Sequence, residues 1–220
     1  LLKKPVDTDI FSRKTVNREF FTSAYDLLLN EAKIYSIPND FKSDLDLKNK
    51  VNSVMCLYNQ ENSAVYSSYG KTIKNGRDLC RKVKFSNEWS KSRPLEEINT
   101  IYDEDYPFIV ADGNLLYFSS KGHNSMGGYD IFKSVWNQEI NAWSKPENLG
   151  VPFNSPFDDM LFIPDKESES AYFASDRNSP IGKIEIFKIK YPKELGSVSI
   201  IKGKFQIGNS GLDFVFRFLS

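Results

Sequence analysis

The sequence predicts an all-β fold made of antiparallel units that recur along the chain. The clearest unit runs from Tyr102 to Phe132, where short apolar segments alternate with turns. Asp112-Gly113 is a turn signal typical of hairpins, because both residues tolerate the backbone angles of a tight turn. A glycine pair, Gly127-Gly128, precedes the next apolar segment. Short strands joined in this way make most of a small antiparallel sheet.

The same pattern recurs on both sides of this unit. The segment Tyr-Phe-Ser-Ser at 117–120 has counterparts at 65–68 and 172–175, at intervals of about 50 to 55 residues. A polar loop and a further strand follow each copy, and Trp89 and Trp143 follow the first two. This period, with about four strands per unit, is typical of β-propeller blades. The predicted units are residues 51–101, 102–158 and 159–192. The first unit has its second and third strands predicted at Ser63–Tyr69 and Arg77–Phe85, and the central unit its second strand at Leu115–Ser120.

Four stretches carry a family resemblance: Asp112-Gly113, Leu116–Ser120, Gly127–Phe132 and Trp143–Gly150. They resemble the WD-like β-propeller repeat, the TolB-type repeat of bacterial envelope proteins, over roughly residues 52–189. More narrowly, the chain resembles the version found in Bacteroidetes cell-envelope proteins that also carry tetratricopeptide or OmpA-like domains. The first unit departs from the pattern by having Arg77 and Cys80 in its third strand. The third unit lacks the Trp and ends early, so its fourth strand is missing from the pattern.

The segments outside the repeat leave alternatives open. Within residues 1–50, Val16–Tyr35 has apolar residues at helical spacing, but we favour an extended, irregular lead-in that supplies part of a further blade. A short helix capped by Asn39 is expected before the first unit. In the tail, 193–220, alternation predicts a strand from Ser199, which Gly208–Gly211 could return as a hairpin. The tail also resembles the start of a carboxypeptidase-regulatory-like β domain.

Three units fall short of the roughly 4–8 blades of known propellers. Either the flanking segments supply another blade, or the chain forms a partial or small propeller. An open arc of blades would expose apolar edges and would need a partner to cover them.

Composition bounds the function. Lys plus Arg and Asp plus Glu number 29 each, so the net charge is zero. This balance argues against nucleic acid or an anionic membrane as the main partner, because both attract basic surfaces. No apolar stretch reaches the ~18 residues of a transmembrane helix. The chain opens without an initiator Met or a signal peptide, so it could be a mature form or a fragment.

The two cysteines, Cys56 and Cys80, fall in the first and third strands of one unit. Such strands are not neighbours, so their Cα atoms should lie ~9–10 Å apart. A disulfide cannot span that distance. We therefore expect two buried free thiols.

Several side chains recur at fixed repeat positions, which favours structural roles. Carboxylates before the first strands should accept hydrogen bonds from turn N–H groups, although calcium binding is the alternative. We expect Gly128 to supply a positive φ at the start of a strand, and the recurring Trp residues to pack between blades. We predict no metal and no cofactor. The structural residues are Asp78, Asp103, Asp105, Asp130, Asp158, Trp89, Trp143 and Gly128.

Three polar loops, at 71–75, 122–128 and 176–181, occupy one repeat position and should share a rim. We predict that this rim is an interaction face. His123, the single histidine, cannot build a zinc site alone and is expected to be a solvated loop residue. Trp136 does not repeat and is a candidate surface contact. The predicted rim residues are Lys71, Lys74, His123, Asn124, Met126, Arg177 and Asn178.

The resemblance and the lack of a nucleophile motif around the serines favour a non-catalytic protein-interaction or scaffold module. The resemblance implies a place in the periplasm or at the outer membrane, with a protein or a peptidoglycan-associated assembly as partner. The alternative is a glycan-binding or glycan-hydrolysing propeller. A hydrolase would need acidic side chains converging within ~5–10 Å at one end of the central channel.

Overall fold

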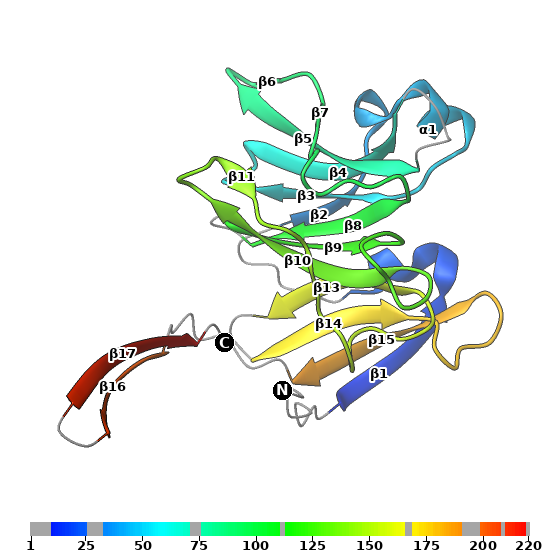
Figure 1. The fold of residues 1–220 in the computed structure, drawn as a ribbon. Coiled ribbons are helices and arrows are strands. Elements are labelled where there is room, and N and C mark those ends of the chain that lie inside the picture. The colour runs from blue at the N-terminus through cyan, green and yellow to red at the C-terminus, as the bar shows by residue number, and fades with distance from the viewer. Residues whose placement is uncertain are drawn as a thin grey trace.

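A computed structural model describes residues 10–25, 33–70, 76–110, 113–165, 169–190, 199–207 and 210–218, and no side chain beyond Lys190 is described. Lys71 and Lys74, predicted for the interaction rim, lie outside these residues. Strands make up 49% of the structure and helices 9%, which confirms the predicted all-β class. Three antiparallel sheets lie one on another, with the sheet formed by residues 33–94 at the top of the view (Figure 1).

The first sheet matches the first predicted unit closely. The predicted second and third strands, Ser63–Tyr69 and Arg77–Phe85, form with those bounds. A strand from the N-terminal lead-in, Lys33–Ser36, adds to the sheet beside the predicted first strand. The strands are β2 (Lys33–Ser36), β3 (Val54–Tyr58), β4 (Ser63–Tyr69), β5 (Arg77–Phe85) and β6 (Glu88–Trp89), with β7 (Arg93–Pro94) also pairing with β5.

The second sheet is the unit that the sequence shows most clearly. Its first strand has an irregular register between Asp105 and Phe108, where Tyr106 adopts a φ of 51°. The third sheet repeats this irregularity after Met160, where Leu161 has a φ of 50°. The strands of the second sheet are β8 (Glu104–Ile109), β9 (Leu115–Ser120), β10 (Asp130–Asn137), β11 (Ala142–Trp143) and β12 (Glu147–Asn148).

The third sheet takes its fourth strand from the other end of the chain. The predicted unit supplies β13 (Asp159–Asp165), β14 (Ser170–Ser175) and β15 (Lys183–Lys190). The N-terminal strand β1 (Ile10–Asn17) pairs antiparallel with β15, so that the sheet order is β1-β15-β14-β13. The missing last strand of the third unit is thus supplied by the lead-in.

The rest of the lead-in is irregular, with short helical turns. A 3-10 helix, η1 (Arg18–Ala24), follows β1, inside the segment where the sequence allowed either a helix or extended chain. A second, η2 (Asn39–Phe41), precedes α1 (Asp44–Lys48). The expected cap at Asn39 is wrong. Ser43 caps α1, because its side chain accepts the Asp46 N–H while the Asp46 carboxylate accepts the Ser43 N–H.

The C-terminal tail forms the hairpin that its turn residues allowed. Strands β16 (Ser199–Ile207) and β17 (Ser210–Phe218) pair antiparallel in a two-stranded sheet. The alternating pattern from Ser199 correctly predicts the first of these strands.

The main core runs through all three sheets, and a second cluster lies around Phe41. Each recurring Trp side chain contacts another aromatic ring, and Trp143 belongs to the main core. Trp143 meets Trp136 edge-on at 5.4 Å, and Trp89 meets Phe41 at 5.3 Å. Trp136, expected at the surface, is therefore partly buried against Trp143.

Both cysteines are buried and free, as expected. Strand β4 lies between the strands that carry Cys56 and Cys80, which keeps the thiols apart. Burial raises the pKa of Cys56 to about 12 and that of Cys80 to about 11. Among the described residues, no helix has the length and apolar character needed to cross a membrane.

The pairing of β1 with β15 can be tested by cross-linking. Thr15 and Glu185 are partners in this pair. Opposed Cα atoms in antiparallel strands lie about 4.5–5.5 Å apart, within the range that a disulfide spans. We expect the double variant Thr15→Cys, Glu185→Cys to form a disulfide on mild oxidation, measured by intact mass and thiol counting.

The matched control places one cysteine two residues away, as Arg13→Cys with Glu185→Cys. Diagonal partners lie about 7–8 Å apart, so this pair should stay reduced under the same conditions. Equal cross-linking in both variants, or in neither, would contradict the register of β1.

Candidate functional site

The polar residues of interest gather at one end of the three sheets. We call this the loop end, defined by the serines at or next to the ends of β4, β9 and β14 (Ser68, Ser120 and Ser175) and by the linkers 98–103 and 153–158 that lead into β8 and β13. The short helix α1 and the coil after β1 lie along this same edge (Figure 1).

A carboxylate joins each linker to the sheet that follows it. Glu104 accepts hydrogen bonds from the Thr100 N–H and hydroxyl, each at 2.8 Å, and from the Ser120 hydroxyl at 2.6 Å. Burial raises the pKa of Glu104, because desolvation disfavours the ionised form. Asp159 takes the same place in the third sheet, with Ser155 N–H at 2.6 Å and its hydroxyl at 2.8 Å.

The first sheet builds the same arrangement from α1. Asp46 accepts hydrogen bonds from the Ser43 N–H and hydroxyl at 2.8 and 2.9 Å, and also from the Ser68 hydroxyl. It further accepts the Tyr69 N–H at 2.9 Å. The capping carboxylate of α1 therefore fastens the helix to the end of β4. Sequence reasoning missed Asp46, although the Ser-x-x-Asp pattern was a usable signal.

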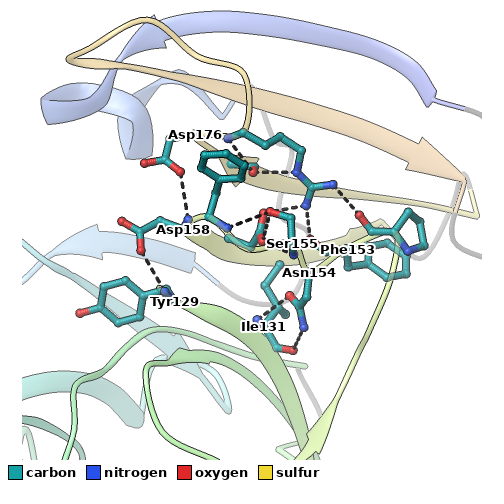
Figure 2. Close-up of polar contacts among 12 residues, drawn as sticks. Tyr129, Ile131, Phe153, Asn154, Ser155, Asp158 and Asp176 are labelled. Atoms are coloured by element: carbon teal, nitrogen blue, oxygen red, sulfur yellow. Dashed lines mark hydrogen bonds and ion pairs between the residues drawn. The ribbon is translucent and has the colours of Figure 1, made fainter. Parts of the chain in front are cut away.

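An asparagine then fixes each linker to the third strand of the preceding sheet. The Asn154 side chain accepts from the Ile131 N–H at 2.7 Å and donates to the Ile131 carbonyl at 2.8 Å (Figure 2). Asn99 makes the same pair of bonds to Leu79, at 2.8 and 3.0 Å. A side-chain amide here imitates a neighbouring strand, because it offers one donor and one acceptor side by side.

Two aspartates at one repeat position also hold the linkers. Asp103 accepts the Arg77 N–H at 3.0 Å, and Asp158 accepts the Tyr129 N–H at 2.9 Å (Figure 2). Each also meets a cation: Lys121 lies 2.9 Å from Asp103, and Arg18 contacts Asp158. Burial opposes ionisation of Asp103, but the bond and charge of Lys121 prevail and lower its pKa.

Asp105 forms a buried ion pair between the first and second sheets. Its Oδ2 lies 2.6 Å from Nη1 of Arg77, and its Oδ1 accepts from the Ser67 hydroxyl at 2.5 Å and from the Ser53 hydroxyl. Arg77 also donates to the Tyr129 hydroxyl at 2.7 Å. Arg77, which departs from the repeat pattern in the sequence, is therefore the partner that a fully buried Asp105 requires.

The expected conformation of Gly128 is wrong, although glycine is needed there. The described glycines with positive φ are Gly76, Gly113, Gly150 and Gly182. At Gly128 the reason is close approach: a Cβ would lie 1.9 Å from the Asp158 carboxylate. The linker before β13 could not pack against this loop if the residue carried a side chain.

Asp130 and Asp78 share a repeat position but differ in surroundings. Asp130 is fully buried, and its Oδ2 accepts from the Met126 N–H at 2.9 Å and the Asn148 amide at 2.8 Å. Its Oδ1 has no hydrogen-bond partner in the described part of the chain. Asp78 is only partly buried, and burial raises its pKa.

His123 is not the solvated loop residue that the sequence suggested. Its ring is partly buried beside Phe118 and Phe132, at 6.0 and 5.4 Å between centroids. Its Nε2 lies 2.7 Å from the carbonyl of Ile98 in the linker. The loop therefore turns its histidine toward the linker, which covers part of the ring.

Arg177 of the third sheet also binds a linker, so its guanidinium is not available to a partner protein. Its guanidinium donates to the carbonyls of Pro152 and Phe153 at 2.8 and 2.5 Å, and pairs with Asp159 at 2.6 Å. It also lies over the ring of Phe173.

Three of the predicted rim residues are exposed at the loop end: Asn124, Met126 and Asn178. Sequence reasoning missed the exposed apolar residues beside them. Tyr102 and Phe157 hold one position in the two linkers and are 54% and 49% exposed. Sequence reasoning used only the acidic residues that follow them, Asp103 and Asp158, and overlooked the aromatic residue that recurs just before.

A pocket of about 700 Å³ lies beside η1 at the loop end. Lys50 and Asn52 before β3, Tyr106 of β8 and the residues of η1 line it, so all three sheets or their flanking segments contribute. Elsewhere in the described residues, no group of three or more His, Cys, Asp or Glu side chains could hold a metal ion.

Removing one member of the buried ion pair should destabilise the fold strongly. We expect Arg77→Met to lower the free energy of unfolding by about 3–5 kcal/mol, because it leaves the Asp105 carboxylate buried without its cation. Denaturant unfolding measures this loss. The control is the double variant Arg77→Met, Asp105→Met, which imitates Met160 at the matching position of β13. It should recover most of the loss, and a double variant as unstable as the single one would contradict the assignment.

The Asp103 contact should make stability depend on acid pH. Because its pKa is lowered in the folded state, Asp103 stabilises the fold above its unfolded-state pKa of about 3.9, and this is lost as pH falls through the folded-state pKa. We expect Asp103→Asn to cost about 1 kcal/mol at pH 7, since the pair is partly exposed, and nothing measurable near pH 2. Exposed Glu96→Gln is the control, and thermal unfolding across pH gives both values.

Comparison with known proteins leaves the chain without a family assignment. No family model matches it, and neither curated proteins nor solved structures show a significant similarity.

Proposed function

We propose that this chain is a non-catalytic interaction or scaffold module built from WD-like β-propeller repeats. The observation that supports the proposal is that charged and aromatic side chains at the loop end have different roles. The carboxylates of Asp46, Glu104 and Asp159 bind their own linkers, whereas the side chains that reach solvent include the rings of Tyr102 and Phe157. A surface of this kind suits docking better than chemistry, because aromatic side chains supply much of the binding energy at protein interfaces.

The arrangement of the sheets supports a small or partial propeller. Each sheet is antiparallel, the units follow one another in sequence order, and β1 completes the last sheet. Closing the last unit with a strand from the other end of the chain ties the two ends of a repeat array together. That closure protects the edge of β15, which would otherwise offer unpaired backbone groups to another chain.

The docking face in this proposal is the loop end. Two further apolar side chains are exposed there: Met126 is 47% exposed, and Ile181 is fully exposed. Asn124 and Asn178 add polar groups between these apolar side chains. Monomeric proteins seldom gather exposed apolar side chains on one surface without a use for them.

The partner and the location follow from the sequence resemblance. A module of this kind would act in the bacterial cell envelope, in the periplasm or at the outer membrane. Its partner would be an envelope protein or a peptidoglycan-associated assembly. No nucleic acid is expected, because acidic and basic residues balance.

Affinity capture tests the docking face. We expect the purified chain to retain an envelope protein from its source bacterium, and the variants Tyr102→Ala, Met126→Ala and Phe157→Ala to weaken that binding about 5- to 30-fold, as loss of an anchoring side chain does. Titration of the recovered partner by biolayer interferometry measures the change.

Matched controls lie at the opposite end of the sheets. Phe85, at the end of β5, and Ile140, in the turn between β10 and β11, are exposed apolar residues away from the loop end, at 68% each. Their alanine variants should bind as the parent does. Equal weakening by both sets of variants, or by neither, would contradict the loop end as the docking face.

A further inference from the structure

The pocket beside η1 differs from the rest of the loop end in how it uses its polar groups. Elsewhere at this end, the side chains of Glu104, Asp159, Arg177 and His123 bind the linkers. In the pocket, the side chains of Lys50, Asn52 and Thr22 make no hydrogen bond or ion pair with any described residue, and neither does the Tyr106 hydroxyl. The pocket therefore presents a set of unused donors and acceptors.

The backbone at two of these positions is also unusual. Lys50 and Tyr106 both have a positive φ, at 51°, which non-glycine residues adopt rarely. At Tyr106 the irregular register of β8 places this residue out of the regular ladder. The matching residue in β13, Leu161, has the same backbone but offers no hydroxyl. The polar group at this position is thus peculiar to the second sheet.

The two charged side chains of the pocket that have no described ion-pair partner carry opposite charges. Lys50 brings one positive charge and Glu19 one negative charge. Arg18 also lines the pocket, but its guanidinium already contacts both Asp158 and Asp176. A strongly anionic ligand would meet the Glu19 carboxylate, and a strongly cationic one would meet Lys50. The lining therefore favours a ligand without net charge.

Aromatic carbon completes the lining. Phe21 and Tyr106 are in contact, with ring centroids 5.5 Å apart, and both border the pocket. Burial raises the pKa of Tyr106 well above its usual value, so its hydroxyl stays protonated and can both donate and accept. Apolar rings beside free donors and acceptors suit a ligand that has C–H groups on its faces and hydroxyl groups around its edge.

We propose that this pocket binds a neutral saccharide. Sugar hydroxyls donate and accept at once, which matches the mixed set of Asn52, Thr22 and Tyr106, and the C–H face of a sugar ring packs on aromatic carbon. The volume of about 700 Å³ lies within the range of small-molecule sites. The proposal is independent of docking at the loop end, because it concerns Tyr106 and Asn52 and not the exposed rings of the linkers.

Binding of defined disaccharides tests the proposal. The probes are chitobiose, cellobiose and maltose, with trialanine as a peptide of similar size. We expect at least one disaccharide to bind at millimolar concentration or below, by calorimetry, and to shift the backbone amide resonances of Asn52 and Tyr106. Tyr106→Phe keeps the ring and removes only the hydroxyl, so it should fold as the parent does and weaken binding about two- to tenfold, as loss of one neutral hydrogen bond does.

Thr22→Val offers a second variant that preserves shape, and Asn124→Ala, outside the pocket, is the control that should not change affinity. Absence of binding by all three disaccharides overturns the proposal. So does binding that Tyr106→Phe and Thr22→Val both leave unchanged, because the sugar then lies elsewhere. Binding of trialanine in preference to the sugars would assign the pocket to peptides instead. Loss of partner capture in the loop-end variants has no bearing on any of these outcomes.

Discussion

The interaction on which the rest of the structure depends is the carboxylate at the start of each sheet. Asp46, Glu104 and Asp159 each accept hydrogen bonds from the turn before the sheet and from the serine at the end of its second strand. One side chain thereby fixes both the direction in which the chain enters and the strand that it must meet. Burial of these groups is costly unless every oxygen is satisfied. The geometry of one linker is therefore specified closely, and repetition of that geometry along the chain sets the order of the sheets.

The two ends of the array are joined by a different means. The N-terminal strand completes the third sheet, and Arg18, directly after it, contacts Asp158 and Asp176. Phe21 then reaches the second sheet, where it packs on Tyr106, and the Tyr25 hydroxyl donates to the Leu161 carbonyl at 3.0 Å. Residues 10–25 thus serve as edge strand, ion-pair partner and core at once. The first part of the chain is integral to the fold, although it lies outside the repeat.

At the loop end, the side chains that hold the fold together differ from those that are available for binding. A carboxylate that binds its own backbone is held away from solvent and chemistry, as Asp105 and Glu104 are. The rings of Tyr102 and Phe157 reach solvent without a structural contact of that kind. The pocket beside η1 combines features of both, because the fold builds it from several segments and yet leaves the side chains of Lys50, Asn52 and Thr22 and the Tyr106 hydroxyl without a described partner. These two surfaces are where binding is proposed, and each rests on its own residues.

The sequence by itself determined the strands, the turns and their repetition. Alternation and turn residues act over a few positions, so Ser63–Tyr69, Arg77–Phe85 and Leu115–Ser120 could be read to the residue. The C-terminal hairpin and the free cysteines followed from the same local logic. The tertiary structure alone decided that Ile10–Asn17 pairs with Lys183–Lys190. It also decided that His123 and Arg177 turn toward the linkers. Only the folded chain shows that Gly128 must lack a side chain because the Asp158 carboxylate lies against it. Those outcomes depend on contacts between segments far apart in the chain. No periodicity in one segment encodes which distant edge, carbonyl or carboxylate will face it.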